Sequence, residues 1–530
     1  MSMENFAPLM FAGLIVIMLI GFPVAFSLSA LGLLCGFVAI EMGWFSPAFM
    51  ANLPLNVFGI LSNDLLLAIP FFTLMGAILE KCGLAEDMLD SMGQLFGPVR
   101  GGLGYSVIIV GFILGAVTGT VAGQVIAMAM ISLPVMMRYG YNMRYATGVL
   151  AASGTITQLV PPSLVLVVLA DQLGRSVGDM YAGALLPGLV LTSMYVAYVF
   201  VRSMIQPDSA PALPPEARTL RGAKLFKRVL FVLVPPLTLI FLVLGTIFLG
   251  IATPTEGGAM GATGALALAL INRRLNWSLL KQAMNSTAKL SSFVIFILVG
   301  STVFGLTFRA VNGDIWVEHL LTGLPGGQIG FLIVVNILVF VLAFFLDFFE
   351  LAFIIVPLLG PVAEKLGIDL IWFGILLGVN MQTSFMHPPF GFALFYLRSV
   401  APAKEYVDKI TGRRMAPITT GQIYWGAVPF VVIQVIMVGI VIAFPGLVID
   451  HYKHDKVDTN IEIVIPPSEY GEPAEEPGSD AGSSAPADDS SDLEKAFGGS
   501  GDGEKSKPQD GGAPKDDSGL SDLEKDFLKK

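Results

Sequence analysis

The stretch TITQLVPPSLV, residues 155–165, places two adjacent prolines inside an apolar segment, and QTSFMHPPFGF, residues 382–392, does the same 227 positions later. The segments before the two proline pairs align without a gap at this offset. Further matching pairs are Pro134 with Pro361, Gly140 with Gly367, Ser153 with Asn380, and Thr157 with Ser384. A series of this length indicates a duplicated unit, which is a common architecture of secondary transporters.

The composition places most of the chain in a lipid bilayer. Hydrophobic residues make up 54% of the sequence and charged residues 14%, and the mean hydropathy is +0.73. A soluble domain carries about 25% charged residues. Several apolar runs reach the roughly 20 residues that cross a hydrocarbon core of about 30 Å, so we expect an all-α polytopic membrane protein. The first run follows no basic residue and has no clear cleavage site, so we expect it to be retained.

Basic residues and prolines divide the chain. Residues 203–228 combine a proline-rich stretch with several Lys and Arg residues, which predicts a solvent-exposed cytoplasmic linker. The linker separates a first transmembrane repeat, residues 1–202, from a second repeat, residues 229–449, and an acidic tail follows at residues 450–530. About five crossings separate corresponding points of the repeats, and an odd number predicts that the two repeats are inverted.

Two apolar segments are too long for one span and contain a polar break near the middle. Residues 101–137 break in the sequence TGT at 118–120, and residues 328–363 break in the sequence DFFE at 347–350. We expect two re-entrant helical hairpins, each followed by a span that a proline pair interrupts. Non-helical backbone at membrane depth must be buried in protein or line a wet cavity. Its free N–H groups suit carboxylates, and its free carbonyl groups suit a hard cation.

Charged and polar side chains at these breaks are candidate ligands. A charge at such a depth costs about 2.5 to 3.5 kcal/mol, which favours a function for Asp347 as a cation ligand and for Glu350 as a ligand or a helix cap. His387 could contact a substrate carboxylate, respond to pH or pack between helices. Glu256, in TPTE, is expected to cap a helix. The candidate substrate contacts are Thr120, Pro161, Pro162, Glu350, His387 and Pro388.

Other classes of membrane protein find little support. Two cysteines and four histidines are too few for a haem or iron–sulfur subunit. The chain has no GxxxxGK[ST] phosphate-binding loop, so it is not expected to hydrolyse ATP. We therefore expect no enzymatic activity, no cofactor, no transition metal and no nucleic-acid partner, with energy supplied by an ion gradient.

Several motifs together resemble one known family. They are AIPFFTLMGAILEKCGL at 68–84, VPPS at 160–163, GIATPTEGGAMGA at 250–262, and LGIDLIWFGILLGVNMQTSFMHPPFGFALFYLRSVAP at 366–402. Over roughly residues 5–447 the chain is similar to the large membrane subunit of tripartite ATP-independent periplasmic (TRAP) transporters.

The resemblance implies a sodium-coupled importer of the ion transporter superfamily, working by an elevator motion in the bacterial inner membrane. It also implies a small four-span membrane subunit and a periplasmic binding protein that delivers the substrate, usually a small organic acid. It places the sodium ions between each hairpin tip and the broken span of the same repeat. The corresponding residues are Thr118, Gly119, Thr120, Thr155 and Thr157, and Asp347, Thr383 and Ser384.

Two departures from the family pattern leave the ligand identities open. Relatives have a serine-rich first hairpin where this chain has TGT, and a TPP-like sequence where it has His387, Pro388 and Pro389. The alternatives to a tripartite importer are an anion carrier that needs no binding protein, and a passive channel or structural membrane subunit.

The tail has a different composition from the rest of the chain. It is rich in Ser, Pro, Gly, Asp and Glu and poor in apolar residues, so we expect it to be disordered. SDLEKAF at 491–497 returns as SDLEKDF at 521–527. This short repeat could dock a partner on folding, or it could belong to a solvated spacer.

Overall fold

The computed structural model describes residues 5–344, 346–388, 391–408 and 410–452. The tail that the composition predicts to be disordered lies outside the described residues from residue 453 onward, as do both SDLEK segments. Pro389 of the second proline pair lies outside them as well. The described residues fall within one unit of the chain.

The first half of the chain is a series of helices joined by short turns. In chain order these are α1 (Phe6–Ile20), α2 (Val24–Glu41), α3 (Pro47–Met50), α4 (Leu53–Leu61), η2 (Asp64–Leu67), α5 (Ala68–Lys81), α6 (Leu84–Phe96), α7 (Gly102–Thr118), α8 (Val121–Arg138), α9 (Met143–Thr155), η3 (Ile156–Gln158), α10 (Leu164–Gln172) and α11 (Val177–Ile205). The short 3₁₀ turns η4 (Pro207–Ser209) and η5 (Pro215–Ala217) lead to the second half.

The second half has the same kind of construction. Its helices are α12 (Gly222–Phe248), α13 (Pro254–Ile271), α14 (Trp277–Ala310), α15 (Gly313–Thr322), α16 (Gly327–Leu342), α17 (Phe348–Ile354), α18 (Val356–Lys365), α19 (Leu370–Met381), η6 (Gln382–Phe385), α20 (Phe392–Val400), α21 (Thr420–Ala443) and α22 (Gly446–Ile449). A two-stranded antiparallel ribbon, β1 (Tyr406–Val407) and β2 (Arg414–Met415), lies between α20 and α21.

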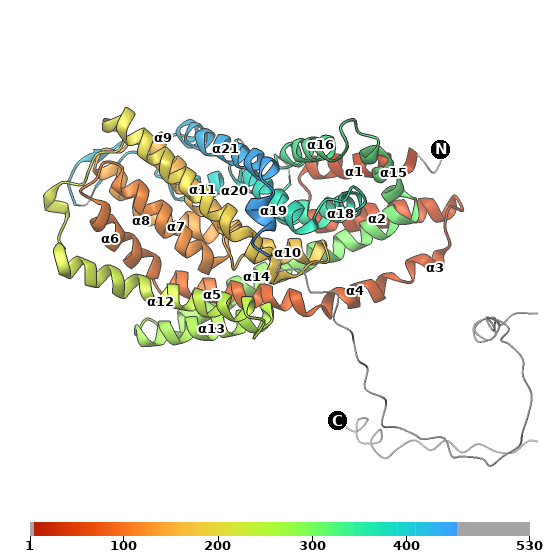
Figure 1. The fold of residues 1–530 in the computed structure, drawn as a ribbon, viewed down its shortest axis with the longest axis horizontal. Coiled ribbons are helices and arrows are strands. Elements are labelled where there is room, and N and C mark those ends of the chain that lie inside the picture. The colour runs from red at the N-terminus through yellow and green to blue at the C-terminus, as the bar shows by residue number, and fades with distance from the viewer. Residues whose placement is uncertain (1–4, 345, 389–390, 409, 453–530) are drawn as a thin grey trace, which may run out of the picture. The chain divides into compact units, whose positions relative to one another are not determined.

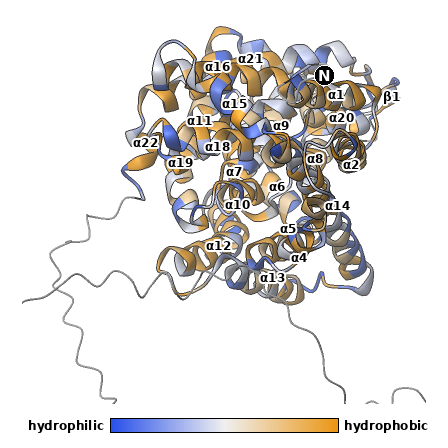
Figure 2. Ribbon diagram, turned by 90° about the vertical axis from the view of Figure 1, so that its right-hand side faces the viewer, coloured by the Kyte–Doolittle hydropathy of each residue, from blue (hydrophilic) through white to orange (hydrophobic). Residues whose placement is uncertain are grey.

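The helices have the length and surface of membrane spans. Among the described residues, 6 helices are long and apolar enough to cross a bilayer, and 8 spans result if each of two bent helix pairs counts as one. Hydrophobic residues dominate the helices in Figure 2, and large apolar side chains project outward, such as Phe231 and Phe241 of α12, which are 74% and 73% exposed. In water this surface would be unfavourable, whereas acyl chains can cover it. The prediction of an all-α polytopic membrane protein is confirmed.

The helix boundaries repeat at the offset found in the sequence. The start of α9 at Met143 corresponds to the start of α19 at Leu370, 227 positions later. Both helices begin with a side-chain cap, because Asn142 accepts hydrogen bonds from two backbone N–H groups and Asp369 does the same. The match between boundaries and caps shows that the two halves repeat one structural unit.

Both predicted hairpins are present. Hairpin 1 is formed by α7 and α8, which lie side by side in Figure 1 and are separated at their tip by Gly119 and Thr120. Gly119 has the left-handed φ of 61° that ends α7, a conformation that glycine adopts without strain. Hairpin 2 denotes α16 and the pair α17 and α18, which are joined before Asp347; α16 packs mainly against α19, and α17 packs mainly against α14 and α10.

The second arm of hairpin 2 is divided, unlike the continuous α8. Pro357 has no N–H group to donate to the carbonyl oxygen of Phe353, so the regular helical bond is absent. Ser301 of α14 donates its hydroxyl to that oxygen instead, at 2.5 Å. A side chain from another helix thus satisfies a carbonyl group that would otherwise lie unpaired in an apolar layer.

Each hairpin is followed by a broken span. Broken span 1 consists of α9, η3 and α10, and broken span 2 consists of α19, η6 and α20. In broken span 1 the helix resumes after the proline pair, where Ser163 caps α10 by accepting from the N–H group of Val165 at 3.1 Å. The prolines therefore interrupt the spans as the sequence predicts.

The linker between the repeats is less exposed than its composition predicts. Ala210 is fully buried, and its carbonyl oxygen accepts from the N–H group of Gly101 at 2.8 Å. Leu213 donates to the carbonyl oxygen of Gly97 at 2.8 Å, and Asn142 donates to that of Ser209 at 2.9 Å. The prediction of a solvent-exposed joint is wrong for this stretch, because its small and apolar residues pack against the base of hairpin 1.

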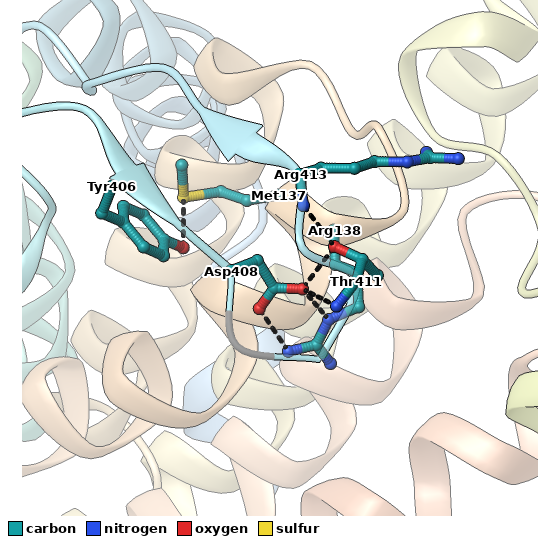
Figure 3. A network of polar contacts seen from close by, with 6 residues as sticks. All are labelled: Met137, Arg138, Tyr406, Asp408, Thr411 and Arg413. Carbon is teal, nitrogen blue, oxygen red and sulfur yellow. Dashed lines mark hydrogen bonds and ion pairs between the residues drawn. The ribbon is translucent and has the colours of Figure 1, made fainter.

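An ion pair fastens the base of hairpin 1 to the second repeat (Figure 3). Arg138, the last residue of α8, donates two hydrogen bonds of 3.0 Å each to the carboxylate of Asp408, which follows β1. Thr411 donates its N–H and hydroxyl groups to the same carboxylate, at 3.0 and 2.6 Å. These bonds, led by that from Arg138, hold the pKa of Asp408 well below its ordinary value.

A second ion pair joins hairpin 2 to the first repeat. Arg175, in the turn after broken span 1, lies 2.9 Å from Glu364 near the end of α18. The outer end of each hairpin is therefore joined to the segment that follows the broken span of the other repeat. Arg138 and Asp408 have side chains only 15% and 8% exposed, whereas Arg175 and Glu364 are 42% and 64% exposed.

Replacing Arg138 by glutamine should lower the midpoint of thermal unfolding in detergent by several degrees, because a largely buried carboxylate loses its partner. Arg175→Gln, the matched control on the exposed pair, should cost at most about 1 kcal/mol. The depressed pKa of Asp408 means that its contribution is complete above about pH 4 and is lost as the pH falls further. Equal midpoints for the two variants at pH 7 would contradict this difference.

Candidate functional site

The tips of both hairpins and the two broken spans line one cavity of about 540 Å³. Its wall is mostly apolar, with a few polar groups that converge on it. The polar side chains that line it are Thr120, Gln158, Asp347, Glu350 and Tyr396, and Phe22, Phe293, Phe296, Phe349, Phe385 and Phe392 are among the apolar ones. A mostly apolar cavity with a small number of polar groups is typical of a binding site for a small molecule.

The structure divides the predicted site residues into three groups. Gly119, Thr120, Asp347 and Glu350 line the cavity. Buried polar residues behind it, with no more than 2% exposed surface, are Thr155, Thr157, Thr383 and Ser384. Those that do not line the cavity are Pro161, Pro162, His387 and Pro388. Thr118 is the last residue of α7, at the tip of hairpin 1.

Hairpin 1 packs tightly against broken span 1. A Cβ atom on Gly111 would lie 2.8 Å from the Cβ of Ser153, and one on Gly115 would lie 3.0 Å from the Cα of Thr157. Only glycine permits this approach of α7 to α9. The predicted residue Thr157 therefore faces the backbone of hairpin 1, one turn before the tip.

Gln124 joins the same two elements through hydrogen bonds. Its amide Nε2 donates to the carbonyl oxygens of Gly111 and Ser153, at 2.6 and 2.9 Å. Its Oε1 accepts from the hydroxyl of Thr157. Gln124 is 1% exposed, and the sequence analysis did not select it. A polar amide within an apolar helix was the available signal, but its partners lie 13 and 29 residues away.

Hairpin 2 is joined to broken span 2 by a different pair of amides. Asn380 donates to the backbone oxygen and to the side-chain oxygen of Asn336, at 2.8 and 2.9 Å. The hydroxyl of Thr383 donates to the carbonyl oxygen of Asn380 at 2.6 Å. In each repeat, amide side chains thus join the hairpin to the broken span, but they stand at different positions in the two repeats.

Asp347 and Glu350 form a capping box at the start of α17. Asp347 Oδ1 accepts from the N–H group of Glu350, and Glu350 Oε2 accepts from the N–H group of Asp347, both at 2.9 Å. Thr253 and Glu256 make the same arrangement at the start of α13, as predicted for Glu256. The helix-cap alternative for Glu350 therefore agrees with the geometry, and each acid keeps one oxygen outside the box.

Several buried oxygen atoms beside the breaks accept no hydrogen bond. They are Oε1 of Gln158, Oε1 of Gln382 and Oγ of Ser384, for which the described part of the chain offers no partner. Gln382 lies next to its repeat mate, since its Nε2 donates to the hydroxyl of Thr155 at 3.4 Å. Unpaired buried oxygens are costly, and these three atoms are available to accept a hydrogen bond or to contact a ligand.

His387 is buried in aromatic surroundings rather than at the cavity. Its ring centroid lies 4.3 Å from those of Phe340 and Phe344, and the side chain is 1% exposed. Neither ring nitrogen has a hydrogen-bond partner among the described residues. This position agrees with the packing alternative for His387.

Two repeated hairpins with their tips at one cavity, each followed by a broken span, define a multi-pass membrane protein of the broken-helix transporter type. The sequence model described as "Tripartite ATP-independent periplasmic transporter, DctM component" matches residues 11–447. The chain therefore belongs to the DctM family, the large membrane subunits of TRAP transporters, and is an integral protein of the bacterial inner membrane.

Named relatives have moderate sequence identity to this chain. The C4-dicarboxylate TRAP transporter large permease protein DctM of Pseudomonas aeruginosa is 30% identical over 68% of this chain and 83% of that protein. The 2,3-diketo-L-gulonate TRAP transporter large permease protein YiaN of Escherichia coli is 27% identical over 74% and 89%. The isethionate TRAP transporter permease protein DctMQ of Oleidesulfovibrio alaskensis is 27% identical over 76% of this chain and 62% of its own length.

A solved structure with a similar fold is the YdaH transporter of Alcanivorax borkumensis. The match has a TM-score of 0.54 and 14% sequence identity, and it covers 74% of this chain and 87% of that one. At this identity the likeness concerns the fold alone.

Gln124→Leu should destabilise the protein by about 1 to 3 kcal/mol, because the bonds from hairpin 1 to broken span 1 are lost. Leucine suits the space, since Leu351 stands at the corresponding position of hairpin 2. Unfolding in mixed detergent micelles would measure the change, with the exposed Gln282→Leu as control. Equal stability of the two variants would show that Gln124 does not hold the hairpin.

Proposed function

We propose that this chain is the large membrane subunit of a sodium-coupled tripartite importer of an organic acid. The convergence of both hairpin tips on one cavity carries the proposal. In this arrangement each tip exposes backbone groups at membrane depth, where they can bind charged solutes in place of water. The substrate is a carboxylate delivered by a periplasmic binding protein, and transport follows an elevator motion of the hairpins and broken spans.

Backbone polarity supports an anionic substrate. The second arm of hairpin 1 begins at Val121, and its N-cap residue Thr120 makes no side-chain cap bond; the positive end of this helix lies at the cavity, which favours an anion there. The relatives named for C4-dicarboxylate, isethionate and 2,3-diketo-L-gulonate all carry organic anions. Their different names leave several organic acids open for this chain.

The acids on the cavity wall explain why such a substrate would need sodium. Asp347 and Glu350 line the same space that would hold a carboxylate, and like charges at close range repel strongly in a medium of low dielectric constant. A sodium ion beside Asp347 would remove this repulsion. Sodium has suitable oxygen ligands in the second repeat, where Ser384 and Gln382 have unpaired oxygens, and in the first, at Thr157 and Gln158.

Affinity purification of the full chain from its native membrane would test the tripartite assembly. We expect a small four-span membrane protein to accompany it and a periplasmic binding protein to dock, with an organic acid as the ligand of that protein. A chain that purifies and transports alone would instead be an independent anion carrier. Flux that is independent of any sodium gradient would indicate a passive channel.

Asp347→Asn should raise the sodium concentration for half-maximal uptake by at least about tenfold, and more than Glu350→Gln does. Both amides can still accept the N–H bonds of the capping box, so the variants remove charge and keep the local structure. Glu256→Gln is the matched control, since it lies in the same type of box away from the cavity. Sodium titration of uptake that gives the reverse order would contradict the assignment.

A further inference from the structure

A carboxylate from outside hairpin 1 lies at the tip of that hairpin. Glu80, near the end of α5, is partly buried. A Cβ atom on Gly123 would overlap its Oε2, would lie 3.0 Å from its Cδ, and would lie 3.2 Å from Oγ1 of Thr120. The Glu80 carboxylate thus occupies the space beside the first turn of α8, and it explains why residue 123 has no side chain.

The corresponding position of hairpin 2 carries an acid where hairpin 1 has a glycine. At the offset of 227 positions, Thr120 corresponds to Asp347 and Gly123 corresponds to Glu350. Hairpin 2 therefore carries both acids of its capping box in its own chain. The first turn of α8 has no acid, and its N-cap makes no side-chain bond. Glu80 brings the carboxylate to the position that Glu350 holds in the other repeat.

We propose that Glu80 is a positioning residue for the transport site, supplying hairpin 1 from α5 with the carboxylate that hairpin 2 supplies for itself. Glu80 does not line the cavity, whereas Thr120 does, so the carboxylate acts through the tip rather than on the solute. The inference rests on the proposed function for its effect on sodium binding. Its effect on the shape of hairpin 1 follows from the contact alone.

The source of the carboxylate gives the two hairpins different properties. Glu350 belongs to α17 and moves with its own helix, so the cap of hairpin 2 persists in every position of that hairpin. Glu80 belongs to a separate helix, so hairpin 1 can leave its carboxylate without any change within α8. A carboxylate beside the first turn of a helix stabilises that turn, because it compensates the positive end of the helix dipole. Helix α5 can therefore bind or release the tip of hairpin 1, whereas hairpin 2 always carries its own cap.

Labelling of a cysteine at the tip would test the contact without any assumption about sodium. The labelling site would be Ala122→Cys, because Ala122 lines the cavity. The native Cys35 and Cys82 would be replaced by alanine in the full chain. We expect Glu80→Gln to increase the rate of maleimide labelling by roughly tenfold, because the amide removes the negative charge that favours the first turn of α8. The exposed Glu86→Gln on the neighbouring helix α6 is the control and should leave the rate unchanged.

Relocation of the carboxylate separates positioning from general stability. Glu80→Ala combined with Gly123→Glu places the acid within α8, as in hairpin 2, and should return the labelling rate to near the original value. Thermal unfolding can be measured in NaCl, with choline chloride as the control salt and no other solute. Glu80→Gln should then need roughly tenfold more sodium to reach half of the maximal stabilisation. The variant with the relocated acid should need about as much sodium as the unmodified chain.

Each outcome has a definite meaning. Labelling and sodium dependence that stay unchanged in Glu80→Gln would overturn the inference, whether or not the relocated variant folds. A well-folded relocated variant that keeps the fast labelling would also overturn it, since the carboxylate would then have no positioning effect. If the unmodified chain shows no sodium response, the proposed function fails, and the labelling result still decides the role of Glu80.

Discussion

The need to pair backbone polar groups inside an apolar layer governs this structure. Every helix break at membrane depth releases N–H and carbonyl groups that lipid cannot satisfy. Side chains from other elements form hydrogen bonds with these groups. Ser301 donates to the carbonyl group that Pro357 leaves unpaired, and Gln124 donates to carbonyl groups of α7 and α9. Unpaired side-chain oxygens of Gln158, Gln382 and Ser384 lie beside the breaks of the two broken spans. In the proposed function, a bound solute supplies the missing partners of these polar groups.

The duplicated unit makes this arrangement possible, and the two copies have diverged where they meet the solute. Hairpin 2 has two acids at its tip, and hairpin 1 has a threonine and a glycine at the same positions. One copy ties its hairpin to the broken span through Gln124, and the other does so through Asn380. The two halves of the cavity wall are therefore unequal: hairpin 2 carries its acids in its own chain, whereas hairpin 1 has none in its first turn.

Ion pairs between the repeats hold the hairpins and the broken spans together. The buried pair of Arg138 and Asp408 and the exposed pair of Arg175 and Glu364 each join the base of one hairpin to a segment of the other repeat. The buried pair contributes more to this connection than the exposed pair, which is worth at most about 1 kcal/mol. This coupling is what an elevator motion would require of the moving part.

The membrane spans, the breaks and the duplication can be predicted from the amino-acid sequence, because hydropathy and the missing N–H group of proline act locally. It also identified four of the residues that line the cavity, since an acid or a flexible TGT break is conspicuous in an apolar segment. The contacts of Gln124 and Glu80, the burial of Ala210 in the linker and the aromatic surroundings of His387 are visible only in the folded chain. Those depend on contacts between residues distant in the chain, and the residue types alone do not specify such partners.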